Sequence, residues 1–334
     1  MSKNYPKYKV AATQIAPVFL DAQGCADKAC KWIREAADNG AKLIGFPEGF
    51  ISGYPWWIWL MPPAAGAELY TKLAENAVEV PGPIVKQIAE AARDNKIYVC
   101  ISVTEKDGGS LYLTQLWFNP AGDLIGKHRK LKPSGGERLV WGEGDASMIP
   151  VFDTELGRLG GLQCWEHWIP LNIQAMNSQN EQVHVASWPS FAPGDEAMTS
   201  APPNETAAKF YAQVTGTFVL NCTQIHTQEI YEGIGKLPPY EHFVEYGGGN
   251  AFVIGPNGKI MTEKIAPGDE GIIYADIDLG IIPGLKYEID PAGHYSNKML
   301  TMTVDKTPKP VTTFVGEGNP KAMKYDEICE ALEK

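Results

Sequence analysis

The sequence lacks the features that direct a chain through or into a membrane. Residues 1–10 carry three lysines, but no apolar run follows them, so a secretory signal peptide is not expected. The most apolar aromatic stretch, residues 54–60, is too short to span a bilayer and is closed by Pro62 and Pro63. We therefore predict a soluble, cytoplasmic protein with no membrane partner.

Basic clusters are absent as well, and cysteine is sparse. Lys and Arg number 29 against 40 Asp and Glu, for a formal net charge of −11, which suits nucleic-acid binding poorly. The six cysteines are scattered along the chain. Cys25 and Cys30 lie five apart, but no close pair of histidines accompanies them. The sequence therefore predicts no nucleic-acid partner, no disulfide framework and no metal site.

The chain has no feature that reads as a linker. Its 334 residues are 44% hydrophobic, enough for a large core, and they contain no Ser/Gly-rich run, charge block or internal repeat. Apolar patterning weakens beyond Asp278. We predict one domain over residues 1–280 and a C-terminal extension, 281–334, that packs on its own subunit or on a neighbour.

Alternating apolar segments predict a layered α/β fold with mixed sheets. The chain opens with a predicted strand at 9–15, a helix at 22–39 capped by Gly40, and a strand at 42–46. Asn204 is predicted to cap a later helix, and residues 192–203 are predicted to form a surface loop. Further helices are predicted at 83–95, from near 170, and up to about 215. Further strands are predicted at 97–104, 159–163, 182–188, 218–223 and 272–277, with hairpins at 111–118/124–130 and 251–254/259–265.

Three of these strands end in residues fit for chemistry: Glu48, Lys130 and Cys164. Ligands of α/β sheets lie beyond the carboxyl ends of strands, so the three side chains converge if their strands are neighbours. A cysteine thiolate is a strong nucleophile, a carboxylate can take its proton, and an ammonium can stabilise developing negative charge. Taken singly, a buried cysteine is more often packing and a charged residue more often a surface ion pair. Strand ends alone leave both interpretations open.

Three motifs, in this order, resemble the nitrilase superfamily of carbon–nitrogen hydrolases. They are Phe46-Pro47-Glu48, then His128-Arg129-Lys130 with Glu137-Arg138 close behind, and Gly160-Gly161-Leu162-Gln163-Cys164-Trp165-Glu166-His167. The match runs from Val10 to about Ser296 and implies a four-layer α-β-β-α sandwich without a cofactor. Cys-Trp-Glu looks like the nitrilase branch, because amidase and carbamoylase branches more often carry Asp at the third position. Segments 184–189 and 290–295 are similar to microbial nitrilases and cyanide dihydratases.

The resemblance also implies roles for individual residues. Glu48 would be the general base, Lys130 the charge stabiliser and Cys164 the nucleophile, with Glu137 and the backbone at Trp165 in support. The implied reaction converts a small-molecule nitrile to the carboxylic acid and ammonia through a covalent thioimidate. Cyanide hydration to formate and ammonia, and amide or carbamoyl hydrolysis on the same scaffold, stay open. Relatives assemble into dimers and spirals, so a homo-oligomer is expected.

Four further residues are predicted to bind the substrate. Tyr54 and Trp57 follow Glu48 closely and Trp188 ends a strand, although aromatic residues in such places are as often core. His167, three residues after Cys164, could begin a metal site or act as the base for the thiol. The resemblance favours Glu48 as base and leaves His167 to shape the pocket or an interface. A peroxide-reactive thiol protein built on Cys164, and a non-catalytic filament-forming scaffold, are rivals of another class.

Overall fold

The computed structural model describes residues 5–149, 151–190, 203–234, 247–316 and 323–332. Its strands form one hydrogen-bonded sheet in the order β6-β5-β4-β2-β1-β10-β9-β8-β7. In addition, β12 pairs with β1, β11 with β10 and β3 with β4. The strands are β1 Lys7–Ile15, β2 Ala41–Gly45, β3 Val78–Glu79, β4 Tyr98–Asp107, β5 Ser110–Phe118, β6 Leu124–Arg129, β7 Val151–Thr154, β8 Gly157–Gln163, β9 Val183–Trp188, β10 Phe218–Gln224, β11 Phe252–Ile254 and β12 Gly271–Asp278.

This sheet folds over so that its two halves face each other. Among the described strands, the two halves share a strand pairing only at the ends of β1 and β10, where Gln14 pairs with Thr223 and Ile15 with Gln224. Elsewhere they stack so closely that a Cβ on Gly45 of β2 would come within 2.7 Å of Val185 on β9. One apolar cluster fills the space between the halves and draws residues from both.

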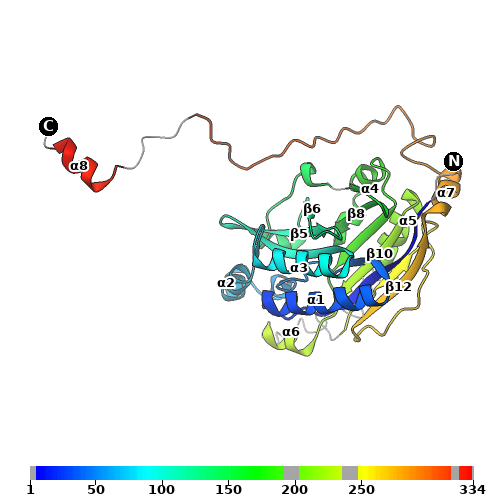
Figure 1. Cartoon of the computed structure of the whole chain (residues 1–334), viewed down its shortest axis with the longest axis horizontal. Helices are drawn as coiled ribbons and strands as arrows, with labels where there is room; N and C mark the ends of the chain where they lie inside the picture. The colour runs from blue at the N-terminus through cyan, green and yellow to red at the C-terminus, as the bar shows by residue number, and fades with distance from the viewer. Residues whose placement is uncertain (1–4, 150, 191–202, 235–246, 317–322, 333–334) are drawn as a thin grey trace.

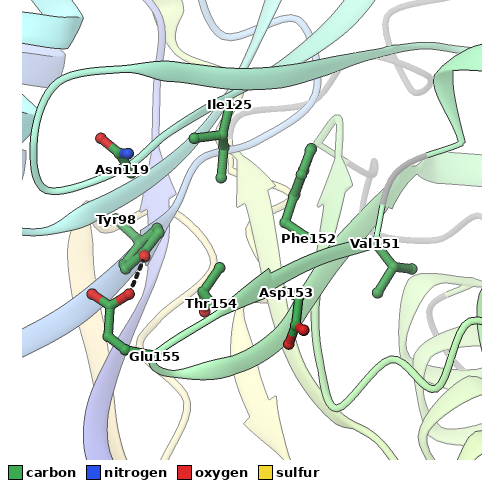
Figure 2. A pocket seen from close by; sticks show the side chains of 8 residues that line it. All are labelled: Tyr98, Asn119, Ile125, Val151, Phe152, Asp153, Thr154 and Glu155. Atoms are coloured by element: carbon green, nitrogen blue, oxygen red, sulfur yellow. Dashed lines mark hydrogen bonds between the residues drawn. The ribbon is translucent and has the colours of Figure 1, made fainter.

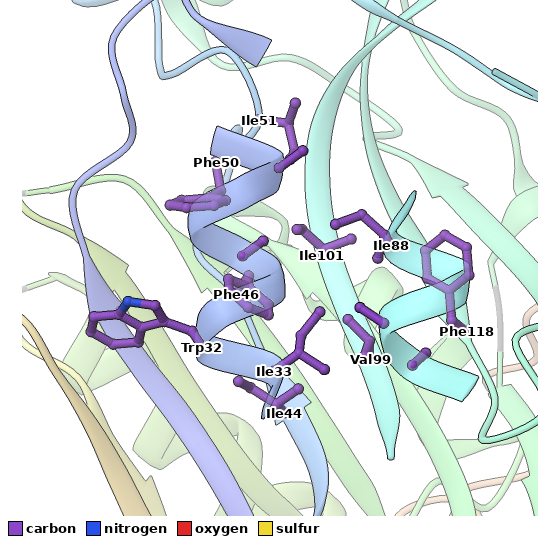
Figure 3. Packing of buried hydrophobic residues seen from close by; sticks show 14 of the residues in the cluster. Trp32, Ile33, Ile44, Phe46, Phe50, Ile51, Ile88, Val99, Ile101 and Phe118 are labelled. Atoms are coloured by element: carbon purple, nitrogen blue, oxygen red, sulfur yellow. The ribbon is translucent and has the colours of Figure 1, made fainter. Parts of the chain in front are cut away.

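Helices cover the two outer faces of the sandwich, as Figure 1 shows for α1 and α3 on one side. Alternate residues of β1 serve the two faces: Val10 and Ala12 point into the space between the sheets, and Ala11 points toward the helices. Figure 3 shows Ile33 of α1 and Ile88 of α3 packing on the outer face of the first half. The helices and 3-10 turns are α1 Ala22–Asp38, α2 Ala67–Glu75, α3 Pro83–Asn95, α4 Pro170–Asn177, α5 Pro203–Thr215, α6 Gln228–Gly233, α7 Ile282–Glu288, α8 Tyr325–Leu332, η1 Trp56–Trp59, η2 Pro63–Gly66, η3 Gly135–Leu139, η4 Ala146–Met148, η5 Cys164–Trp168 and η7 Leu279–Ile281.

Helices α4 and α5 cover the second half, where a third apolar cluster joins them to β8, β9 and β10. The layers are therefore helix, sheet, sheet, helix, and the predicted α-β-β-α sandwich is confirmed. The predicted helices at 22–39 and 83–95 and the hairpin at 111–118/124–130 are found within a few residues of their predicted bounds.

Two local predictions were wrong. The predicted strand at 259–265 is reduced to a single bridge between Ile254 and Ile260, because the hydroxyl of Thr262 accepts the Val253 N–H that a ladder carbonyl would have taken. Asn204 does not cap α5, which begins one residue earlier. Its side chain instead donates to the carbonyl of Asn250 at 3.1 Å. The predicted surface loop at 192–203 lies, apart from Pro203, outside the described residues.

Beyond α7 the described chain has no helix or strand until α8, and residues 289–316 run outside the sandwich (Figure 1). They contact it at few points. The Lys309 N–H donates to Asp145 at 2.8 Å, and Lys306 Nζ donates to Gln179 at 2.7 Å. The division between a domain at 1–280 and an extension at 281–334 stays a prediction. In the part of the chain that the structure describes, no helix combines the length and apolarity needed to cross a membrane.

Candidate active site

The three strands that deliver Glu48, Lys130 and Cys164 are not neighbours in the sheet. Two strands separate β2 from β6, and β8 belongs to the opposite half. The pairings nevertheless make all three run in the same direction, so their carboxyl ends lie at one end of the sandwich. Stacking of the two halves then brings the three side chains together, where the sequence suggested that adjacent strands would.

A charged cluster forms where β2 and β6 end. The Lys130 ammonium donates to Glu48 Oε1 at 2.6 Å and to Glu137 Oε2 at 2.8 Å. Glu137 begins no strand of its own; it sits in η3, where its side chain also accepts the Ser134 N–H at 2.6 Å. The Tyr54 hydroxyl donates to the other Glu137 oxygen at 2.8 Å. All five residues lie past the ends of strands, and the side chains of Glu48, Glu137 and Lys130 are almost fully buried.

Cys164 sits on a tight turn from β8 into η5. Its φ is +47°, a left-handed conformation that costs a residue with a Cβ of order 1 kcal/mol or more. Glycine leads into this turn because its surroundings are crowded: a Cβ on Gly161 would come within 2.7 Å of the carbonyl of Val185 on the adjacent β9 and within 2.9 Å of Gln115 Oε1 on the opposite half. The turn therefore fixes the thiol beside Glu48. A hydrogen bond with this thiol lowers the pKa of Glu48.

Burial sets the protonation of the cluster. It raises the pKa of Glu48 to about 8, even though Lys130 acts in the opposite direction. Burial, with the negative charge of Glu48, also holds the pKa of the Cys164 thiol well above its ordinary value. Burial would lower the pKa of Lys130, but the charges of Glu137 and Glu48 outweigh it and the ammonium is kept. Cys164 therefore rests as a thiol beside a carboxyl group that titrates near neutral pH and can act as a base.

Comparison with known proteins shows which family the chain belongs to. The model of carbon–nitrogen hydrolases matches residues 9–287. The chain belongs to the carbon–nitrogen hydrolase family. It is 52% identical over 327 residues to a nitrilase of Bacillus sp. (strain OxB-1), covering 97% of this chain and 96% of that one. It is 44% identical to an aliphatic nitrilase of Rhodococcus rhodochrous over 86% of this chain and 80% of that one. In fold it is similar to Nit3 of Saccharomyces cerevisiae, with a TM-score of 0.65, 22% identity and coverage of 85% and 94%.

One acid in this carbon–nitrogen hydrolase joins the segment that carries Lys130 to the turn that carries Cys164. Glu166 accepts from His128 Nε2 at 2.8 Å, from the Leu131 N–H at 2.9 Å and from the Gln163 N–H at 2.9 Å. Burial opposes the charge on Glu166, but His128 and these donors lower its pKa, and in turn Glu166 raises the pKa of His128. The buried ion pair therefore ties the segment that carries Lys130 to the turn that carries Cys164.

Uncharged side chains form hydrogen bonds between the two sheet halves beside the charged cluster. These contacts were not predicted from the sequence. Gln115 Nε2 donates to the Ser187 hydroxyl at 2.8 Å, and that hydroxyl donates to the Phe46 carbonyl at 2.8 Å. Ser102 donates to Gln163, whose Nε2 donates to a carbonyl of β5 at 3.0 Å. These four residues lie inside strands predicted as ordinary core. Their only sequence signal is polarity in otherwise apolar runs.

The residues predicted to bind substrate divide into two groups. Tyr54 reaches the cluster through Glu137, and Trp57 lines a groove of about 310 Å³ that also contains Leu139 and Val140. His167 and Trp188 lie on the other side of Cys164, with their rings stacked 4.9 Å apart. All four are almost fully buried. Contact with substrate stays a prediction for each.

His167 does not face the thiol as a base would. Its Nδ1 lies 2.7 Å from the Cys164 carbonyl oxygen, and its Nε2 lies 2.9 Å from Nε2 of His184. Both ring nitrogens are thus engaged away from Sγ. The geometry gives the rival assignment of His167 as base no support.

A larger cleft, of about 660 Å³, lies at the other end of the sandwich (Figure 2). Tyr98 starts β4 and Thr154 pairs with the first residue of β8, so both lie at the end of the strands opposite Cys164. In this cleft the Tyr98 hydroxyl donates to Glu155 at 2.6 Å. Its distance along the strands separates it from the cluster of Glu48, Lys130 and Cys164.

Proposed function

We propose that this carbon–nitrogen hydrolase converts a nitrile to its carboxylic acid and ammonia, with Cys164 as nucleophile, Glu48 as general base and Lys130 as charge stabiliser. One observation carries the proposal: a buried thiol beside a carboxyl group that is itself held by a buried ammonium. Identity of 52% with an enzyme named nitrilase, over almost the full length of both chains, favours nitriles among the substrates of the family.

The first half of the reaction forms the covalent bond. Because the thiol rests protonated and Glu48 titrates near pH 8, proton transfer to Glu48 accompanies attack of sulfur on the nitrile carbon. The C≡N bond becomes C=N in a thioimidate, and the nitrogen takes the proton that Glu48 received from the thiol, which leaves Glu48 free to act as a base again. Lys130 and the backbone N–H of Trp165, which already lowers the pKa of the Cys164 thiol, stabilise the charge that develops on nitrogen.

The second half consumes two waters. Glu48 takes a proton from the first water, whose oxygen adds to the thioimidate carbon, and passes it to the nitrogen. The hydroxyl proton of the tetrahedral intermediate follows through Glu48 to the nitrogen, and ammonia leaves to give a thioester. The second water, activated in the same way, releases the carboxylic acid and restores the thiol. Glu137 and Tyr54 support these steps by holding Lys130 in place. Expulsion of sulfur in place of ammonia would give an amide.

An ammonia-release screen tests the proposal. The purified protein is given aliphatic, aryl and arylaceto nitriles, hydrogen cyanide, and the amide that matches each nitrile. We expect ammonia and acid from at least one organic nitrile and none from a folded Cys164→Ala variant. Turnover of amides alone would assign an amidase, turnover of cyanide alone a cyanide dihydratase, and full activity in folded Cys164→Ala would remove the nucleophile.

We also propose that the protein is cytoplasmic and forms homo-oligomers through its C-terminal extension, residues 281–334. The described part of this extension presents many large apolar side chains to solvent, which favours burial against another subunit. They are Tyr287, Tyr295, Met299, Leu300, Val311, Phe314, Val315, Tyr325 and Leu332. Light scattering on the full chain and on a chain ending at Glu288 should show a larger assembly only for the full chain.

A further inference from the structure

A buried hydrogen-bond chain runs away from Cys164 on the side opposite the thiol. It begins at the Cys164 carbonyl, passes through His167 and His184 at 2.7 and 2.9 Å, and reaches Glu181 Oε1, 2.7 Å from His184 Nδ1. The Tyr211 hydroxyl donates to the other Glu181 oxygen. All four of these side chains are almost fully buried.

The first link fixes where protons can lie. A carbonyl oxygen can only accept, so His167 Nδ1 must carry a hydrogen and donate it to Cys164. One hydrogen is shared between the two Nε2 atoms and one between His184 Nδ1 and Glu181. Two arrangements satisfy every link. Either Glu181 is protonated and donates while both rings are neutral, or Glu181 is ionised and one ring is an imidazolium.

The surroundings of Glu181 favour the neutral arrangement. No cation within the described ranges makes an ion pair with it apart from His184 itself, and Lys286 acts only from a distance. Outside the hydrogen-bond chain, His128 and Lys130 place positive charge near the two histidine rings, and Glu166 acts in the opposite direction. Burial raises the pKa of Glu181 well above its ordinary value and lowers the pKa of both histidines to about 3.

The chain acts on the peptide bond that matters for catalysis. A peptide unit is planar and trans, so the carbonyl of Cys164 and the N–H of Trp165 point in opposite directions. Holding that carbonyl from His167 therefore aims the Trp165 N–H toward the thiol and the charge that forms there. It also stabilises the left-handed backbone of Cys164.

We propose that Glu181 is a protonated carboxylic acid at the head of a neutral chain, Glu181 to His184 to His167 to the Cys164 carbonyl, which positions the nucleophile turn and the Trp165 N–H. The three side chains are positioning residues, since none touches the reacting atoms. The proposal deepens the proposed function and rests on it only for its kinetic test.

The protonation pattern can be measured without turnover. The chain has six histidines, so solid-state NMR of the full protein labelled with ¹⁵N-histidine is tractable, with assignment from His167→Gln and His184→Gln. We expect His167 to carry its hydrogen on Nδ1 alone and His184 on Nε2 alone. Two protonated nitrogens on either ring would mean an ionised Glu181 and would overturn the proposal.

Two variants at Glu181 test positioning. In Glu181→Gln the amide can donate to His184 and accept from Tyr211, so kcat on a substrate nitrile should stay within about threefold of wild type. In Glu181→Leu both links are lost, and kcat should fall about tenfold or more while KM changes little. Equal losses in both variants would show that charge on Glu181 is needed. Full activity of Glu181→Leu would show that the chain positions nothing.

These results separate the two proposals. If the wild-type protein hydrolyses no nitrile, the proposed function fails, yet the NMR pattern still decides the protonation of the chain. If Glu181→Leu does not fold, comparison of wild type with Glu181→Gln by kcat and by NMR still tests whether Glu181 is protonated.

Discussion

Two buried acid clusters meet at Cys164, and they differ in what neutralises them. On the thiol side, Glu48 and Glu137 share the Lys130 ammonium at 2.6 and 2.8 Å. On the carbonyl side, Glu181 has a histidine and a tyrosine as hydrogen-bond partners. All three carboxyl groups are almost fully removed from water.

The difference follows from the cost of burying charge. A carboxylate taken out of water is destabilised by several kcal/mol unless an opposite charge lies within hydrogen-bond reach. Lys130 supplies that charge on one side, so the pKa of Glu48 is raised only to about 8 and the group can still ionise to act as a base. Since no lysine of the described residues forms an ion pair with it, Glu181 is suited to keep its proton. In our proposals the same residue type thus serves reactivity on one side of Cys164 and orientation on the other.

Removal of Lys130 should have the largest effect, because it takes away the cation that distinguishes the thiol side of Cys164 from the carbonyl side. Lys130→Met leaves Glu48 and Glu137 buried without a cation, so the pKa of Glu48 should rise further, and the base and the charge stabiliser are lost together. We expect nitrile turnover to fall about 10³-fold or more and the free energy of unfolding by about 3–5 kcal/mol. Ammonia release and denaturant titration measure the two effects. Lys132→Met, at an exposed ion pair with Glu143, is the control and should change neither appreciably.

The ion pair between Glu166 and His128 should set a second, pH-dependent effect on stability. Glu166→Gln removes a charge that accepts three hydrogen bonds, at a cost of about 2–3 kcal/mol. The lowered pKa of Glu166 stabilises the fold above the ordinary glutamate pKa of 4.5, and this is lost as pH falls through the lowered value. The raised pKa of His128 stabilises it below the ordinary histidine pKa of 6.5, and this is lost as pH rises through the raised value.

The difference in stability between wild type and Glu166→Gln should therefore be largest between about pH 4.5 and pH 6.5 and should shrink on both sides. Urea titrations across this range measure it. A difference independent of pH would mean that the pair is not charged.

The base on the thiol side offers a kinetic test of the same electrostatics. Because Glu48 must be ionised, kcat/KM should rise with pH through about 8. Glu137 raises the pKa of Glu48 by its like charge, so Glu137→Gln should move this rise to lower pH, and should lower the maximum about tenfold by weakening the hold on Lys130. Glu143→Gln, at the exposed pair, is the matched control. Movement of the rise to higher pH would contradict the assignment of Glu48 as base.

These two sides of the site were unequally predictable from sequence. Glu48, Lys130 and Cys164 each follow an apolar strand, and the motifs around them resemble a known family, so their candidacy was visible. Their meeting was not, because it depends on two sheet halves stacking and not on neighbouring strands. Strand periodicity gives the face of a residue but not the strand that lies opposite.

The hydrogen-bond chain that leads from Glu181 to the Cys164 carbonyl has almost no recognisable signal in the local sequence. Glu181 stands before an ordinary apolar strand, and Tyr211 lies 30 residues away on a helix whose polar and apolar positions alternate as usual. A buried acid is distinguished from an exposed one only by what packs over it, which here is α5. The incorrect prediction of a strand at 259–265 has a similar cause. The Thr262 hydroxyl accepts the hydrogen bond from the Val253 N–H that a backbone carbonyl would accept in a regular strand pairing.

The smallest predicted effect compares the two tyrosines. Tyr54 donates to Glu137, which is paired with the Lys130 ammonium at 2.8 Å, and Tyr211 donates to Glu181, which is neutral in our proposal. A hydrogen bond to a charged group contributes about 1.5–3 kcal/mol and one to a neutral group about 1 kcal/mol. Tyr54→Phe should therefore lower the free energy of unfolding more than Tyr211→Phe, by about 1 kcal/mol, as measured by denaturant titration at pH 7. Equal losses, or a larger loss for Tyr211→Phe, would mean that both sides of Cys164 carry charge, and the contrast between them would fail.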